Sequence, residues 1–169
     1  MRSTEINNSA DILDSRDIIK RLEELESERE DLQTAIDEAR EAYDEAKEED
    51  EKAQSDEEGT TMSEHNLDQV EITMDEATES LADWDNADEY KNLKALAEQC
   101  EGYGDWRYGE TLIRDSYFTE YAQQLADDIG AIKDDSWPCN CIDWEQAASE
   151  LQGDYMSVEF DGTTYWMRS

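Results

Sequence analysis

The acidic stretch from Leu22 to Glu89 is the feature that most constrains what this chain can fold into. It holds 28 Asp and Glu against 4 Lys and Arg, a net charge of −24 over 68 residues. From Ala53 to Glu89 there are 13 acids and no Lys or Arg. Self-repulsion destabilises a compact state, so no folded domain needs this charge for its own sake. We therefore expect a basic partner to use it, and a surface that normally binds nucleic acid is the leading candidate.

The remaining composition indicates that part of the chain folds. The 169 residues suit one or two small domains, and five Trp with eight Tyr are too many for a disordered acidic tail. A net charge of −34 argues against direct binding to nucleic acid or to an anionic membrane. Salt adaptation is an alternative explanation. It would make the surface acidic throughout, whereas the charge is −23 over residues 1–100 and −11 over residues 101–169.

The cysteines and the N-terminus favour the cytosol. Cys100, Cys139 and Cys141 make an odd count without a disulfide-framework spacing, and His65 is the only histidine. We expect reduced thiols and no zinc site. Met1 to Leu13 lacks the apolar core of a signal peptide, and no run approaches the ~20 apolar residues of a membrane span. The sequence therefore predicts a cytoplasmic protein, located in the cytosol of a cell.

A first heptad pattern follows a flexible N-terminus over residues 1–15. Asp14 and Ser15 are suitable N-caps for a helix. Apolar residues then recur in alternating steps of four and three, interrupted by Arg29: Ile18, Leu22, Leu25, Leu32, Ile36, Ala39, Tyr43 and Ala46. This seam is narrow, so it must pack against another helix.

A second seam follows an acidic break from Glu48 to Thr61. It comprises Leu67, Val70, Met74, Ala77, Leu81 and Trp84. An antiparallel helical hairpin between the two seams is the simplest arrangement, and a coiled coil between chains stays open. A later helix start is the alternative: Thr73 and Glu76 would form a capping box, with residues 67–72 extended.

A third helix should begin at a capping box of Asn86 and Glu89 and end at Gly102. One face of it carries Tyr90, Leu93, Leu96, Ala97 and Cys100. The connector over residues 102–109 is rich in glycine and aromatic residues. Arg107 is the only basic residue there, so packing on the core is favoured over base stacking.

The last third predicts a compact unit with most of the aromatic core. Asp115 or Ser116 could cap a helix that ends at Gly130 and whose apolar face holds Phe118, Tyr121, Ala122, Leu125 and Ile129. Asp143 should cap a short helix before a hairpin turned by Asp161-Gly162. Four aromatic residues are assigned to the core: Trp144, Tyr155, Phe160 and Trp166.

These patterns define an α+β fold that is predominantly α-helical. We expect a flexible N-terminus over 1–15, an acidic helical hairpin or coiled coil over 16–101, and a small helical unit over 102–169 that ends in a β-hairpin. No phosphate loop, nucleophile elbow or zinc motif is present, and adjacent acid pairs such as Asp127-Asp128 are expected by chance among 48 acids. We predict no enzyme, no cofactor and no metal.

From about Phe118 onward the sequence resembles the C-terminal domain of ArdA-type antirestriction proteins of plasmids, transposons and phages. The similar segments are Tyr121-Ala122, Asp127-Asp128-Ile129-Gly130-Ala131-Ile132, Ile142-Asp143-Trp144 with Ala147 and Leu151, Gly153-Asp154-Tyr155 and Thr164-Tyr165-Trp166. They cover about 50 of the 169 residues; the acidic half does not look like the other ArdA domains. The resemblance implies a homodimeric phage or mobile-element protein that mimics DNA in the groove of a type I restriction-modification enzyme.

Charge and resemblance together lead to one functional hypothesis. The chain is expected to be an acidic DNA mimic that occupies the DNA-binding site of a defence enzyme, of antirestriction or anti-CRISPR type. Its charge of −34 corresponds to that of about 17 base pairs. Its alternative is an acidic coiled-coil scaffold without mimicry. The predicted mimic surface comprises Glu23, Glu24, Glu28, Asp31, Asp37, Glu38, Glu41, Asp44, Glu45, Glu48, Asp75, Glu76, Glu79, Asp83, Asp85, Asp88 and, by the resemblance, Asp127 and Asp128.

Overall fold

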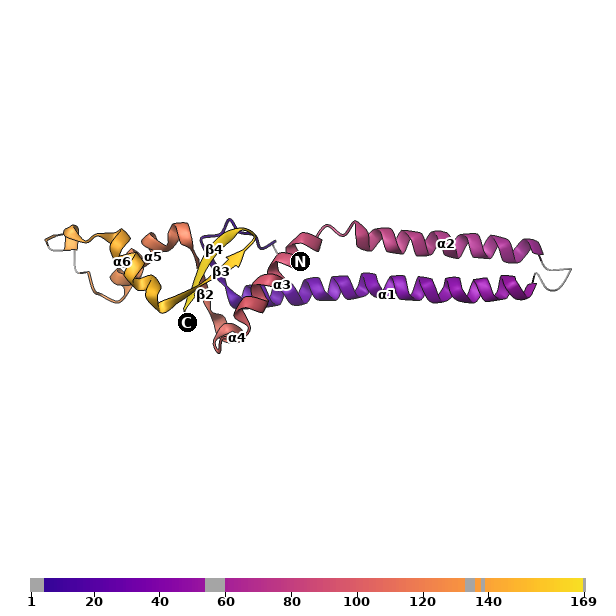
Figure 1. The fold of residues 1–169 in the computed structure, drawn as a ribbon, viewed down its shortest axis with the longest axis horizontal. Helices are drawn as coiled ribbons and strands as arrows, with labels where there is room; N and C mark the ends of the chain where they lie inside the picture. Colours follow the sequence, from indigo (N-terminus) through magenta and orange to yellow (C-terminus); the bar gives the residue numbers. More distant parts are fainter. Residues whose placement is uncertain (1–4, 54–59, 133–135, 138, 169) are drawn as a thin grey trace. The chain divides into compact units, whose positions relative to one another are not determined.

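A computed structural model describes residues 5–53, 60–132, 136–137 and 139–168 (Figure 1). The chain divides into two compact units. Residues Glu24–Ala87 form the first, which we call the hairpin unit, and Met1–Glu23 with Asp88–Ser169 form the second, which we call the α+β unit. The predicted boundaries at residues 15 and 101 thus differ from those of the structure, because the N-terminal residues and the third helix belong with the C-terminal unit.

The hairpin unit consists of most of α1 (Ser15–Ala53) and of α2 (Thr60–Ala82). Figure 1 shows α2 running antiparallel beside α1. The predicted seam residues of α1 are buried or half-buried, except Arg29, which is exposed. Every predicted seam residue of α2 is half-buried, while the other α2 side chains described, from Asn66 to Ala82, are exposed. The heptad pattern therefore identified the inward face of both helices.

The later start for the second helix is wrong. Residues 67–72 are helical, and the Thr73 hydroxyl donates to the Gln69 carbonyl at 3.0 Å inside α2. The predicted break is also shorter than expected, because α1 continues to Ala53 and α2 begins at Thr60. Its middle, with Ser55 and Gly59, lies outside the described residues.

The α+β unit contains a four-stranded antiparallel sheet in the order β1-β2-β4-β3. Its strands are β1 (Ile12–Asp14), β2 (Thr111–Arg114), β3 (Tyr155–Phe160) and β4 (Thr163–Arg168). The predicted terminal hairpin is confirmed. Asp161 and Gly162 both have positive φ, 47° and 72°, as a two-residue type I′ turn requires.

Two of the four strands were not predicted. Residues 1–15 were expected to be flexible, but Ile12–Asp14 pair with β2, and the Tyr165 hydroxyl donates to the Ala10 carbonyl at 2.6 Å. Strand β2 is short, and its Leu112 and Ile113 are fully buried in the middle of the sheet. A run of four residues beside a glycine-rich connector is too short to show a strand period.

Besides the start of α1, the described residues of this unit form four helices: α3 (Ala87–Cys100), α4 (Trp106–Gly109), α5 (Phe118–Asp128) and α6 (Trp144–Leu151). Short 3-10 turns lie at Asp115–Tyr117, Cys139–Cys141 and Gln152–Asp154. Strand β2, α5 and α6 share one buried cluster of Ile113, Phe118, Ala122 and Ala148, against which Tyr155 and Trp166 pack. Phe160 is buried, whereas Trp144 is half-buried.

Some predicted caps are confirmed. The Asp14 carboxylate accepts from the Arg16 backbone N–H at 2.8 Å, and Asp143 accepts from the Gln146 N–H at 3.1 Å. Gly130, with φ of 70°, follows the end of α5 as expected. Ser15 acts differently: its hydroxyl accepts from the Glu110 N–H at 2.7 Å.

Other predicted caps are wrong because tertiary partners occupy the side chains. Glu89 binds Arg21 and the Ile6 N–H instead of closing a capping box with Asn86. Asp115 accepts from the Trp166 indole N–H at 2.8 Å, and α5 begins without a side-chain cap. The third helix ends at Cys100, and Gly102 does not adopt a left-handed conformation.

The aromatic connector and the end of α5 divide between core and surface. Trp106 is only 3% exposed, so packing on the core is confirmed for this residue. Tyr103 and Tyr108 are 43% and 80% exposed, which that prediction did not anticipate. Ile129, expected on the apolar face of its helix, is 70% exposed because α5 ends one residue earlier.

Candidate partner-binding surface

The outward side of α1 in the hairpin unit is a continuous ridge of carboxylates. Opposite the seam, three neighbouring heptad positions are occupied almost entirely by acids. We call this set the acidic ridge: Glu24, Glu30, Asp31, Asp37, Glu38, Glu41, Asp44, Glu45, Glu48 and Glu51. All are exposed except Glu24, which is half-buried. At ~1.5 Å of rise per residue, the ridge presents one carboxylate per ~4 Å of helix axis.

The linear charge density of the folded hairpin approaches that of duplex DNA. The hairpin unit carries 25 acids and 4 basic residues in 64 residues, a net charge of −21. Its part of α1, from Glu24 to Ala53, is about 45 Å long at ~1.5 Å per residue. Since α2 returns beside this part of α1, the net charge of the unit averages one per about 2.1 Å of that length, against ~1.7 Å in B-DNA. Folding back roughly doubles the density of a single extended helix.

This charge distribution opposes helix stability. Neighbours four residues apart on the ridge carry like charges, as at Asp37 and Glu41 or Asp44 and Glu48, and each such pair costs about 0.2–0.5 kcal/mol. The nearby ion pair of Lys52 with Glu48, at 3.6 Å, offsets little because both side chains are about three-quarters exposed. The ridge is therefore not explained by the needs of the fold.

The exposed side of α2 is acidic as well. Asp68, Glu71, Asp75, Glu76 and Glu79 are all exposed, and Asp83 and Asp85 follow the last turn. Acids at a helix C-terminus oppose the helix dipole. No Lys or Arg occurs between Ala53 and Glu89 to balance them.

The predicted surface residues fall in both units. The hairpin unit brings together those from Glu24 to Asp85, whereas Glu23, Asp88, Asp127 and Asp128 belong to the α+β unit. Asp127 and Asp128 are exposed in the last turn of α5, where they too oppose the helix dipole. Sequence reasoning missed Glu30 and Glu51 on the ridge. Extending the heptad register to the outward positions would have found them.

Glu89 is an acidic residue with a structural role inside the α+β unit. Glu89 forms an ion pair with Arg21 at 2.6 Å, and both side chains are less than one-tenth exposed. Burial alone would raise the pKa of Glu89. Hydrogen bonds from Arg21 and from the Ile6 N–H outweigh this effect and hold the pKa below its ordinary value. The pair joins the N-terminal segment, α1 and α3 within the α+β unit.

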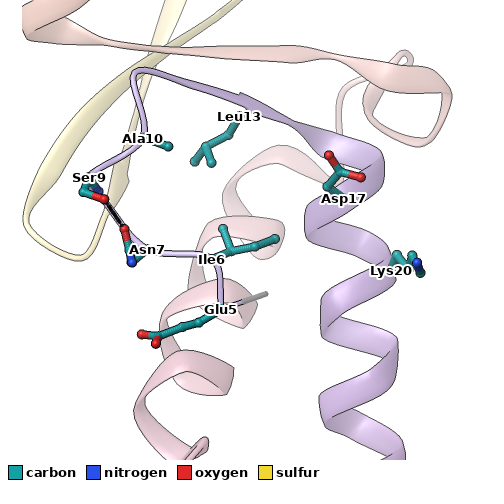
Figure 2. Close-up of a pocket in the computed structure, with 8 residues that line it drawn as sticks. All are labelled: Glu5, Ile6, Asn7, Ser9, Ala10, Leu13, Asp17 and Lys20. Carbon is teal, nitrogen blue, oxygen red and sulfur yellow. Dashed lines mark hydrogen bonds between the residues drawn. The ribbon is translucent and has the colours of Figure 1, made fainter. Parts of the chain in front are cut away.

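The α+β unit also has a surface pocket of about 480 Å³ beside the start of α1 (Figure 2). Figure 2 shows Ile6 and Leu13 between the N-terminal segment and α1, with Asp17 and Lys20 along the helix. The lining mixes apolar and singly charged groups and includes no histidine or cysteine. Of its polar side chains, the Ser9 hydroxyl donates a hydrogen bond to the side-chain oxygen of Asn7.

Burial affects two further ionisable groups of the α+β unit, the Cys100 thiol and the Tyr155 hydroxyl. Burial raises the pKa of the Cys100 thiol to about 11, so the nucleophilic thiolate is disfavoured. The hydroxyls of Tyr121 and Tyr155 share a hydrogen bond of 3.1 Å, and burial, the largest cause, raises the pKa of Tyr155. Within the described residues, no three His, Cys, Asp or Glu side chains are grouped so as to hold a metal ion.

Comparisons with protein-family models, with curated proteins and with solved structures found no match for the chain. The resemblance to ArdA-type proteins therefore stays a prediction from the residues quoted for it. No helix in the described part of the chain is both long and apolar enough to cross a membrane.

Proposed function

We propose that this protein is an acidic DNA mimic that inhibits a DNA-binding defence enzyme of the host, of antirestriction or anti-CRISPR type. It acts by occupying the enzyme's DNA-binding site. The observation that carries the proposal is the charge density of the hairpin unit, about one net charge per 2.1 Å against ~1.7 Å in duplex DNA. Like-charged neighbours on the acidic ridge also oppose helix stability, which supports a use of these carboxylates in binding.

Inhibition by this route is competition for basic side chains. Carboxylates fixed on two helices meet the Lys and Arg that otherwise contact phosphates, and counterions are released from the acidic surface. Long-range attraction between opposite charges accelerates the encounter, which makes association fast at low salt and slower as salt rises. While the acidic surface is bound, DNA is excluded from the same groove.

A second candidate function is an acidic scaffold that binds partners through its apolar seam. The seam residues of α2 are half-buried and keep part of their apolar surface exposed. Another helix could still bury that surface. Such a partner would be bound by hydrophobic contact. Its affinity would depend little on salt and not at all on competing DNA.

Capture from host extract distinguishes the two candidates. The immobilised protein is incubated with extract proteins that were first retained on DNA-cellulose and eluted. Bound proteins are then eluted either with NaCl from ~0.05 to ~0.5 M or with duplex DNA of about 17 base pairs. Polyglutamate, an acidic polymer without a fixed fold, is immobilised on a second support as the control.

The mimic hypothesis expects a partner that binds this protein but not polyglutamate, dissociates as salt rises and is displaced by duplex DNA. A partner that stays bound in salt and in excess DNA would support the scaffold. Failure to capture any DNA-binding protein would contradict the mimic hypothesis.

A further inference from the structure

Strand β3 forms one edge of the sheet in the α+β unit, since β4 is its only neighbour in the strand order. In an antiparallel strand, the N–H and C=O of one residue point to the same side, and the side alternates along the strand. Phe160 pairs with Thr163 across the two-residue turn, so Phe160, Val158 and Met156 bond to β4. The backbone groups of Tyr155, Ser157 and Glu159 therefore point away from the sheet.

The side chain of Gln99 occupies one of these outward positions. From the last turn of α3, its amide N–H donates to the Glu159 carbonyl at 2.9 Å, and its amide oxygen accepts from the Glu159 N–H at 3.0 Å. These are the two hydrogen bonds that a neighbouring strand would make at Glu159. Gln99 thus takes the place of one residue of a fifth strand.

We propose that Gln99 blocks the outer edge of β3, to which a further β-strand could otherwise add. The strand that fits this edge is β3 of a second copy of the chain. Exposed strand edges are templates for pairing with other chains, and native proteins block them with dedicated devices. Ser157 and Glu159 are both exposed, so the edge of β3 is accessible beside the Gln99 side chain. This inference is independent of the proposed function.

The register favours a second copy as the occupant. With a two-fold axis at Ser157, two antiparallel β3 strands pair Ser157 with Ser157 and each Tyr155 with the other Glu159. All three outward residues then use their N–H and C=O groups, and no carboxylate lies opposite another carboxylate. Gln99 removes Glu159 from this ladder on both copies, and with it two of the three residue pairs.

The test compares Gln99→Ala with Gln123→Ala, an equally neutral change at an exposed position of α5. Sedimentation equilibrium of the full chain at ~0.5 M NaCl, which screens the net charge, measures association. We expect Gln99→Ala to raise the association constant about tenfold or more over both wild type and Gln123→Ala. Equal association of the two variants would overturn the proposal.

Hydrogen exchange locates the interface. In the wild type we expect the Glu159 amide to be protected by Gln99 and the Ser157 amide to exchange freely. In Gln99→Ala the Ser157 and Glu159 amides should become protected as protein concentration rises. Adding Ser157→Pro removes the outward N–H of residue 157, a substitution that a strand edge tolerates, and should abolish the concentration-dependent protection of the Glu159 amide. If Gln99→Ala associates while the Ser157 amide stays unprotected, pairing through β3 is refuted, and this readout does not depend on the proline variant.

Discussion

The two units of this protein handle charge in opposite ways. The α+β unit carries −13 over 105 residues and contains nearly all of the large, fully buried side chains, from Phe118 and Tyr165 to Leu93 and Met167. The hairpin unit carries −21 over 64 residues and, among its described residues, buries only Leu25, Ala39, Ala46 and Asp50. In the α+β unit acids and bases are closer to balance and one pair of them is buried, whereas in the hairpin unit acids predominate on the exposed side.

This contrast separates residues that build structure from residues that are displayed. The buried pair of Arg21 and Glu89 and the ring cluster around Phe118 hold the α+β unit together. The acidic ridge weakens the helix on which it lies. The ridge extends over four heptads although it lowers helix stability. We therefore infer that its acids serve binding and not the fold.

The largest expected difference concerns core packing. Phe118→Ala removes a ring whose centroid lies 5.1 Å from that of Tyr155 and 5.6 Å from that of Tyr121. We expect it to lower the free energy of unfolding by about 3–5 kcal/mol in urea titrations. Ile72→Ala, at a 52% exposed position of α2, should cost no more than about 0.5 kcal/mol. Comparable losses would remove the distinction between the units.

Breaking the buried ion pair should cost nearly as much. Arg21→Met leaves the Glu89 carboxylate without its guanidinium in a site less than one-tenth exposed, and we expect a loss of about 3–5 kcal/mol. The double variant Arg21→Met, Glu89→Gln should recover a large part of this, measured by urea unfolding at pH 7. No recovery would show that Arg21 acts by packing.

Acidification should weaken the α+β unit around the buried Glu89. The pKa of Glu89 is lowered, so its contribution to stability is fully present above the ordinary glutamate range and is lost as pH falls through the lowered value. Amide hydrogen exchange at pH 7 and pH 3.5, corrected for intrinsic rates, should therefore show faster opening around α3 at the lower pH. Unchanged opening around α3 would contradict a stabilising role of the pair of Arg21 and Glu89.

The smallest effect concerns helix ends. Asp143→Ala removes the side-chain bond to the Gln146 N–H at 3.1 Å and should cost about 1 kcal/mol of α+β unit stability. Gln33→Ala removes an exposed 3.2 Å bond to Asp37 and should change stability by less than about 0.5 kcal/mol. Thermal unfolding followed by near-UV and far-UV circular dichroism measures both.

Periodicity predicted the parts of the fold that depend on local pattern. The two seams, the Asp161-Gly162 turn and the cap at Asp143 could all be recognised, because a helix period or a turn residue is visible within a few positions. Strands β1 and β2 could not. Each is short, and they pair with each other although about a hundred positions separate them in the sequence. Predicted caps were wrong where the side chain binds a group distant in the sequence, as Glu89 binds Arg21.

The sequence predicted the charge of the candidate surface and which residues of α1 are exposed, but not how the two helices are arranged. The seam register places Asp37, Glu41 and Asp44 outward, so their exposure followed from the sequence. That α2 returns beside α1 within one unit, and so roughly doubles the charge per unit length, depends on tertiary packing.

The most direct test of the central claim, that the hairpin carboxylates are displayed for a basic partner, is a matched neutralisation. One variant carries Asp37→Asn, Glu41→Gln, Asp44→Asn, Glu45→Gln and Glu48→Gln on the ridge. Its control carries Glu98→Gln, Asp105→Asn, Glu120→Gln, Glu145→Gln and Asp161→Asn at exposed sites of the α+β unit, with the same change in net charge. Each variant competes with labelled duplex DNA for the partner captured from extract. We predict that the ridge variant loses competition at least ~10-fold while the control stays within ~2-fold of wild type; equal losses, or none in the ridge variant, would contradict the claim.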